Sequence, residues 1–140
     1  MNPQFVEDRV RMPALGLIAT AIVGLLMHTF GAAIYALSLI SSSVAVFVEE
    51  TGSLSMLFDA AGGLLVHGIG IVMGIVVLIG GIRMRRLSGR GFAMFASVIA
   101  ILPCSPCCFL GLPVGLWSLV TLSDPQVRDA FESNLHGLGY

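Results

Sequence analysis

Three long uncharged runs dominate the pattern of hydrophobic and polar positions along the chain. No Asp, Glu, Lys or Arg occurs at residues 13–48, 60–82 or 91–123. A helix needs about 20 apolar residues to cross the hydrocarbon core of a bilayer. The first two runs therefore predict one membrane-spanning helix each, at about residues 13–40 and 57–83.

Prolines interrupt the third run. As one helix, its 33 residues would be about 50 Å long, whereas the hydrocarbon core is about 30 Å thick. Pro103 and Pro106 each remove a backbone donor and disfavour helix at the residue before them. We therefore predict a helical hairpin with spans at about residues 88–103 and 107–123. The alternative is a chain of three spans, with its two termini on opposite sides.

A short amphipathic helix is predicted after the last span. Residues 123–125 combine capping side chains with a proline, a pattern typical of a helix start. Val127, Phe131 and Leu135 then recur every four residues with charged residues between them. This pattern predicts a helix at about residues 125–135 that lies along the membrane interface; the alternative is a frayed tail.

Composition agrees with a membrane protein. The 140 residues are 56% hydrophobic and only 11% charged, with a mean hydropathy of +0.97, which excludes an ordinary soluble domain. The first uncharged run is far longer than the roughly 7–15 apolar residues of a signal peptide. The predicted fold is all-α: residues 1–140 form a single transmembrane domain, a four-helix bundle of two antiparallel hairpins plus the interfacial helix.

The arginines predict the orientation of the spans. The chain has no lysine, and four of its seven arginines lie within residues 83–90, between the second and third runs. Arg9 and Arg11 precede the first run, and residues 41–59 carry only acidic charges. Because short cytoplasmic segments carry an excess of positive charge, we expect both termini on the cytoplasmic side.

The C-terminal half carries a recognisable pattern. Pro103-Cys-Ser-Pro-Cys-Cys-Phe-Leu-Gly-Leu-Pro-Val-Gly-Leu-Trp117, followed by Pro125-Gln-Val-Arg-Asp-Ala-Phe131, resembles small bacterial four-span inner-membrane proteins of uncharacterised function. The resemblance covers about residues 80–131. It implies the four-span hairpin arrangement and a multi-pass protein of the bacterial inner (cytoplasmic) membrane, and it implies no activity.

Small residues predict how the spans pack. In lipid, helices associate by close van der Waals contact along stripes of small residues. One stripe follows the first span at a spacing of four: Gly16, Thr20, Gly24, His28, Ala32 and Ala36. A second stripe follows the second span: Gly63, His67, Gly70, Gly74 and Gly81. Gly111 and Gly115 form a third close-approach pair in the last span.

Two histidines lie on these stripes. His28 and His67 are about equally far from the arginine-bearing ends of their helices, so we expect them at similar depth and facing each other. Two such imidazoles could bind a haem or pigment as axial ligands. The alternative, which we favour, is a polar pair that joins two helices and binds no cofactor.

All three cysteines lie close together, at Cys104, Cys107 and Cys108. They fit small apolar side chains packed in a tight turn, a disulfide on the outer side, or a redox or metal site. A structural zinc site needs four ligands, and no further cysteine or histidine lies near enough in sequence. We therefore favour packing and predict no metal.

The sequence argues against several activities. No carboxylate lies inside the three uncharged runs, as a proton-coupled exporter would need, and no phosphate loop or H-E-x-x-H motif is present. We predict a non-catalytic accessory or structural subunit without catalytic residues or cofactor. Its expected partners are the bilayer and other integral membrane subunits or a second copy, and no nucleic acid. The alternatives are a haem- or pigment-binding electron-transfer or light-harvesting component and a thiol-based periplasmic sensor.

Overall fold

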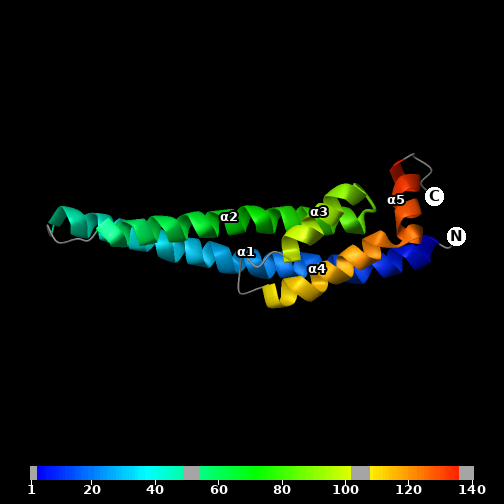
Figure 1. Cartoon of the computed structure of the whole chain (residues 1–140), viewed down its shortest axis with the longest axis horizontal. Helices are drawn as coiled ribbons and strands as arrows, with labels where there is room; N and C mark the ends of the chain where they lie inside the picture. Colours follow the sequence, from blue (N-terminus) through cyan, green and yellow to red (C-terminus); the bar gives the residue numbers. More distant parts are fainter. Residues whose placement is uncertain (1–2, 49–53, 102–107, 136–140) are drawn as a thin grey trace.

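The computed structural model describes residues 3–48, 54–101 and 108–135, and over these ranges its only regular secondary structure is α-helix, as the predicted all-α class requires. No strand occurs in these three ranges. Figure 1 shows the five helices: α1 (Pro3–Val48), α2 (Leu54–Arg85), α3 (Arg90–Ile101), α4 (Cys108–Ser123) and α5 (Pro125–Leu135).

An antiparallel pair of long helices forms the frame of the molecule (Figure 1). Helix α1 has 46 residues and α2 has 32, which correspond to about 69 Å and about 48 Å. Both are long and apolar enough to cross a membrane. All seven arginines lie at one end of the pair. Arg9 and Arg11 are on α1, four lie within residues 83–90 at the end of α2 and the start of α3, and Arg128 is on α5.

Helix α1 begins ten residues before the predicted span and continues through Pro13. Its N-terminal turns are held by one buried face, since Val6, Val10, Ala14 and Leu17 are all at most 4% exposed. Charged residues between these positions hide the helical spacing in the sequence. The start of α1 therefore depends on the burial of this face against other helices, and the uncharged run alone does not define it.

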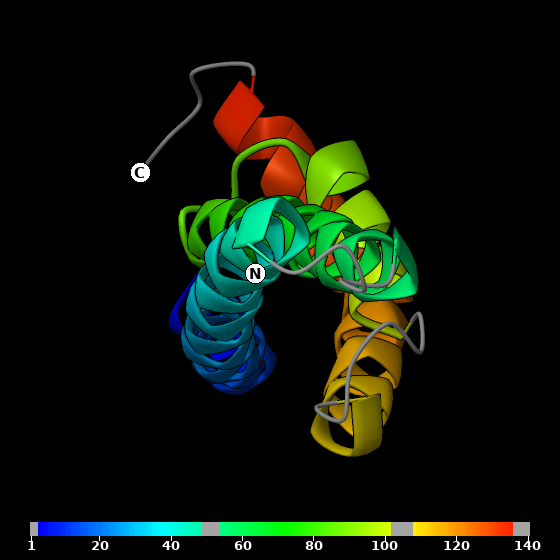
Figure 2. The same cartoon turned by 90° about the vertical axis from the view of Figure 1, so that its left-hand side faces the viewer.

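The two shorter apolar helices, α3 and α4, cover only part of this frame (Figures 1 and 2). They have 12 and 16 residues, or about 18 Å and about 24 Å. Helix α3 packs on α2, with Ala96 against Gly80, and α4 packs on α1, with Val114 against Gly16. We call residues 3–21 and 74–85 of the long pair the arginine half, and residues 22–48 and 54–73 the far half.

A tight turn connects α2 to α3. Ser88 N–H donates to the Arg83 carbonyl (3.0 Å) and Leu87 N–H donates to the Met84 carbonyl (3.1 Å), which is the bonding of a Schellman cap. Leu87 adopts the left-handed conformation (φ 48°), as does Gly89 (φ 68°). This cap reverses the chain within a few residues, so that α3 lies against the helix it follows.

Helix α5 lies across the base of the bundle, beside the N-terminal end of α1 (Figure 1). Its bounds agree with the sequence prediction. Asp124 caps it by accepting a hydrogen bond from Gln126 N–H (2.9 Å), and the other carboxylate oxygen accepts one from Arg9 (2.7 Å). Val127 and Phe131 are 1% and 0% exposed, so these two apolar residues are buried against the bundle.

The hydrophobic core lies entirely in the arginine half and the helices packed on it. Its members come from all five helices: Val6, Val10, Ala14, Leu17, Ala21, Val77, Met84, Ala93, Leu122, Val127 and Phe131. In the far half, by contrast, His28, Ala60 and Gly70 are the only buried residues among the side chains that the structure describes. Large apolar side chains of the far half are exposed, among them Leu26, Phe30, Leu37, Phe58, Leu65 and Ile69.

Candidate functional site

Two histidines meet between α1 and α2 in the far half of the pair. His28 Nδ1 and His67 Nδ1 are 3.2 Å apart, so one nitrogen donates and the other accepts, according to the tautomers of the two rings. The rings meet edge to face, with centroids 5.4 Å apart and planes at 62°. The sequence prediction that the two histidines lie at one depth and face each other agrees with this contact.

Glycines make the approach of the two rings possible. The His28 ring lies against Gly70 of α2, and the His67 ring lies against Gly31 of α1. A Cβ atom at either glycine would collide with the opposing imidazole. Each ring therefore contacts the backbone of the other helix, and no larger residue fits at these two positions without moving the helices apart.

Tyr35 extends the site by one turn. Its ring lies 5.3 Å from the His67 ring, tilted by 38°, and it lies against Gly63, where a Cβ atom would again collide. Sequence reasoning identified Gly63 but missed Gly31 and Tyr35. Their signal was present, because Gly31 and Tyr35 follow His28 by three and seven residues and so share its helix face.

The glycines predicted to pack lie on different contact surfaces. Gly70 and Gly74 face α1, with Leu25 about 3.0 Å from where a Gly74 Cβ would lie. Gly111 and Gly115 face α3, whose Ala100 and Ser97 carbonyl oxygens would lie 2.5 Å and 2.9 Å from the two added Cβ atoms. These four positions therefore allow close helix contacts.

The predicted stripe on α1 is not one contact face. Gly16 faces α4, where a Cβ would lie 2.9 Å from Val114, while His28 faces α2, and Gly24 has no described atom within 4 Å of a Cβ. Positions four apart advance by about 40° around a helix at each step. Residues spaced strictly by four therefore face one neighbouring helix at the start of the stripe and another about three helical turns later.

The arrangement of the rings fits a joint between helices better than a haem site. Two axial imidazoles bind an iron from opposite faces of the macrocycle, whereas these two nitrogens are within hydrogen-bonding distance of each other. Glycine backbone and the Tyr35 ring lie against the imidazoles. The pair thus satisfies one ring nitrogen of each histidine internally, as a polar contact between membrane helices does.

The cysteine cluster cannot be compared with this site. Cys104 and Cys107 lie outside the described residues, and Cys108 is described only as the first residue of α4. Their packing, disulfide and redox interpretations therefore stay predictions. Within the described ranges, no three His, Cys, Asp or Glu side chains come together as a metal site would need.

Comparisons with protein-family models, with curated proteins and with solved structures found no match to this chain. The resemblance of residues 80–131 to small four-span proteins therefore stays a prediction from the sequence.

Proposed function

We propose that this chain is a non-catalytic integral membrane protein that serves as an accessory or structural subunit for other membrane helices. Membrane insertion is supported by the exposure of its most apolar stretches. In the candidate spans Asp8–Val44 and Ser55–Arg85, only 17% and 22% of the most apolar 18-residue stretch is buried. Apolar surface of this extent on a soluble monomer would be a binding or aggregation site, whereas lipid solvates it.

The alignment of α1 with α2 indicates which part of the long pair would lie in the hydrocarbon core of the bilayer. The uncharged stretch 60–82 of α2 has 23 residues and is about 34 Å long, close to the thickness of the hydrocarbon core. Gly81 lies beside Ile18 and Gly63 beside Tyr35, so this stretch is level with about residues 16–38 of α1. The His28–His67 contact then lies near the middle of the bilayer.

Beyond residue 38, where the part of α1 inside the proposed hydrocarbon core ends, the helix carries a run of serines that suits a membrane boundary. Ser41 and Ser43 donate hydrogen bonds to the carbonyls of Ser38 (3.0 Å) and Ile40 (2.8 Å), and Ser42 donates to Ser38 as well (2.6 Å). These bonds keep the hydroxyls satisfied within the helix. The run is level with Asp59 of α2, where the uncharged stretch of that helix ends.

The positions of α3 and α4 favour a hairpin that enters and leaves the membrane on one side. Ala96 lies beside Gly80 and Val114 beside Gly16, so Ile101 and Cys108 are level with about residues 75 and 22. Both helix ends then lie near mid-membrane, about 12 Å from the level of Arg83. The four-span prediction requires these helices to cross completely; either arrangement leaves both termini on one side.

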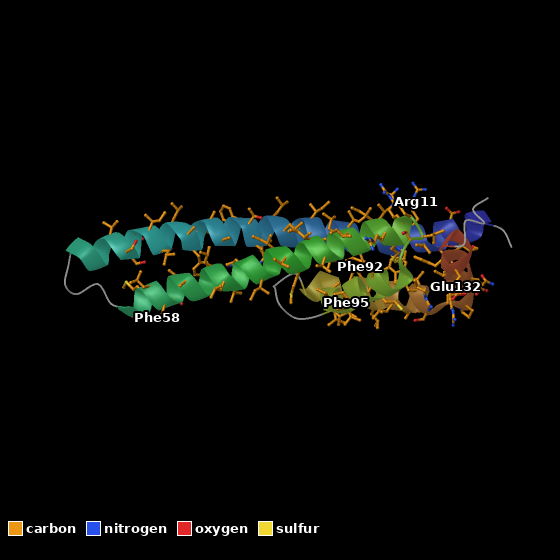
Figure 3. The ribbon with its side chains drawn as sticks, turned by 90° about the horizontal axis from the view of Figure 1, so that it is seen from above. Arg11, Phe58, Phe92, Phe95 and Glu132 are labelled. Carbon is orange, nitrogen blue, oxygen red and sulfur yellow. The ribbon has the colours of Figure 1, made fainter. Side chains whose placement is uncertain are left out.

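The charge distribution supports the orientation. All seven arginines lie at one end of the long pair, and Figure 3 shows Arg11 and Glu132 at that end and Phe58 toward the other. By the positive-inside rule this end is cytoplasmic. With the sequence resemblance, this makes the bacterial inner membrane, with cytoplasmic termini, the proposed location.

One observation carries the accessory role: among the residues that the structure describes, no third helix packs on the far half of the long pair. Phe30, Leu37 and Leu65 there are 71%, 68% and 69% exposed. The surface of α2 has a hollow of about 460 Å³ between side chains of this helix. Gly68 lies within it, and a Cβ atom added there would have no described atom within 4 Å. Small residues beside large ones allow a further helix to approach closely. The hollow is lined by Leu64, Leu65, Gly68, Ile69, Val72 and Met73.

Site-specific photocrosslinking tests this proposal in intact cells. The photoreactive residue p-benzoylphenylalanine would replace Phe30 or Leu65 in the far half, and Phe95, which is 58% exposed on α3, as a matched control. We expect a discrete protein adduct from the far half and lipid adducts alone from position 95. Mass spectrometry of the adduct then distinguishes another subunit from a second copy.

Absence of protein adducts from both far-half positions would overturn the accessory role. Alkaline carbonate extraction of the same membranes tests insertion separately, because a chain released into the soluble fraction is not an integral membrane protein.

A further inference from the structure

Two adjoining hollows open between α1 and α2 at the arginine end. One, of about 310 Å³, is lined by Asp8, Val10, Arg11, Arg85 and Leu87. The other, of about 270 Å³, is lined by Ile18, Ile82, Arg85 and Arg86. Arg85 lines both, so the two hollows adjoin at this residue, and we call them together the depression.

Three other arginines of the chain make contacts that join helices. Arg9 bonds to Asp124, Arg90 donates to the Leu122 carbonyl (3.0 Å), and Arg83 lies 4.9 Å from the centre of the Phe92 ring. These contacts join α2 to α3, α3 to α4, and α1 to the junction of α4 and α5.

Arg11 and Arg85, by contrast, make no hydrogen bond or ion pair with any residue that the structure describes. Both are exposed, and Figure 3 shows Arg11 projecting away from the helices. A guanidinium group presents a planar fork of donors that matches the oxygens of a phosphate. The pair therefore offers donors that no described residue of the fold uses.

The other wall of the depression is apolar. Ile18 and Ile82 lie on the membrane side of Arg85, and Ile82 is the last residue of the uncharged stretch of α2. A ligand here would meet guanidinium groups at one end and hydrocarbon at the other. This polarity fits an amphiphile with an anionic head, and basic pockets between helices on the cytoplasmic side bind such lipids.

We infer that Arg11 and Arg85 bind the phosphodiester headgroup of an anionic phospholipid in the cytoplasmic leaflet. Asp8 lines the outer hollow and lowers its positive charge, so the phosphate lies at Arg85, where the hollows join. The acyl chains then follow Ile18 and Ile82 into the bilayer. This inference rests on the proposed membrane insertion and on the cytoplasmic position of the arginine end.

Native mass spectrometry of the full chain, released from mixed micelles of phosphatidylglycerol and phosphatidylcholine, tests the site. We expect the wild-type chain to retain phosphatidylglycerol at least about fivefold over phosphatidylcholine, since each arginine near an anionic surface contributes roughly that factor. The double variant Arg11→Gln/Arg85→Gln should lose the preference. Arg128→Gln, which removes a charge that bonds to Glu132 on α5, should keep it.

An unchanged preference in the double variant, or an equal loss in Arg128→Gln, would overturn the site. Inorganic phosphate and glycerophosphate form a separate arm: if either displaces the lipid at millimolar concentration, the site recognises free phosphate and the lipid assignment fails. Carbonate extraction distinguishes failure of the proposed membrane insertion from failure of the proposed lipid site. A chain that stays in the membrane but shows no lipid preference refutes this inference alone.

Discussion

The two halves of the long helical pair are held together in different ways. The arginine half and the three shorter helices packed on it share one core, in which side chains of five helices interdigitate around Leu17, Met84, Leu122 and Phe131. In the far half, two helices meet through rings laid into glycine positions, and nearly everything else faces outward. The first mode depends on buried volume and the second on the absence of side chains at a few positions. Substitutions should therefore act oppositely, with truncation harming one half and enlargement the other.

The largest expected effect is loss of volume at the base of the arginine half. Phe131→Ala removes a fully buried ring, and such truncations cost about 3–5 kcal/mol. We expect the midpoint of thermal unfolding in mild detergent, followed by circular dichroism, to fall clearly. Phe95→Ala is the control because Phe95 is 58% exposed; equal losses from both variants would contradict the core described here.

The next effect is enlargement in the far half. Gly70→Leu forces a side chain into the His28 ring, and overpacking of this kind costs about 1–3 kcal/mol. The matched variant Gly68→Leu lies two residues away, where nothing is within 4 Å. We expect the first to lower the free energy of unfolding in dodecyl sulfate titrations and the second to leave it nearly unchanged. Similar losses from both would mean that the glycine contacts do not hold the far half.

A smaller effect is expected where α5 is attached. Asp124→Ala removes both the cap of α5 and the bond to Arg9, and loss of a cap costs about 0.5–2 kcal/mol. Hydrogen exchange should become faster at residues 125–135 and stay unchanged in the far half. Asp129→Ala is the control, since Asp129 is exposed on the same helix. Faster exchange in the far half would show that the two halves unfold together.

The smallest effect is expected from the histidine contact itself. Polar contacts between membrane helices average about 0.6 kcal/mol, with a maximum near 1.7. A double-mutant cycle with His28→Phe and His67→Phe should give a coupling energy in this range. A coupling indistinguishable from zero would refute the hydrogen bond, and one far above the range would indicate that the histidines hold something besides each other.

The sequence predicted the elements of the fold better than their positions along one another. The start of α5 was predictable because its cap and its apolar spacing are local signals. The level at which α3 packs along α2 was not, because an uncharged run shows which residues tolerate lipid without fixing their level against another helix. That level depends on Ala96 meeting Gly80, a contact between distant segments.

The candidate site also contains residues that the sequence predicted and residues that it missed. His28 and His67 were predicted to meet because both are polar residues equally far from arginines, which a single sequence reveals. Tyr35 and Gly31 were missed because an aromatic residue and a glycine are ordinary in an apolar helix. Their role depends on which side of α1 meets α2, and a spacing of four residues does not determine that side.

Helix α1 is, finally, about twice as long as the bilayer core is thick, and it is continuous from the base to beyond the serine run. In mechanical terms it is a lever. The helices packed on the arginine half act as its fulcrum, and the bare far half is the arm. Because α5 is fastened to the short end through Arg9 and Asp124, a tilt imposed on the far half would reach the arginine end as a displacement of α5.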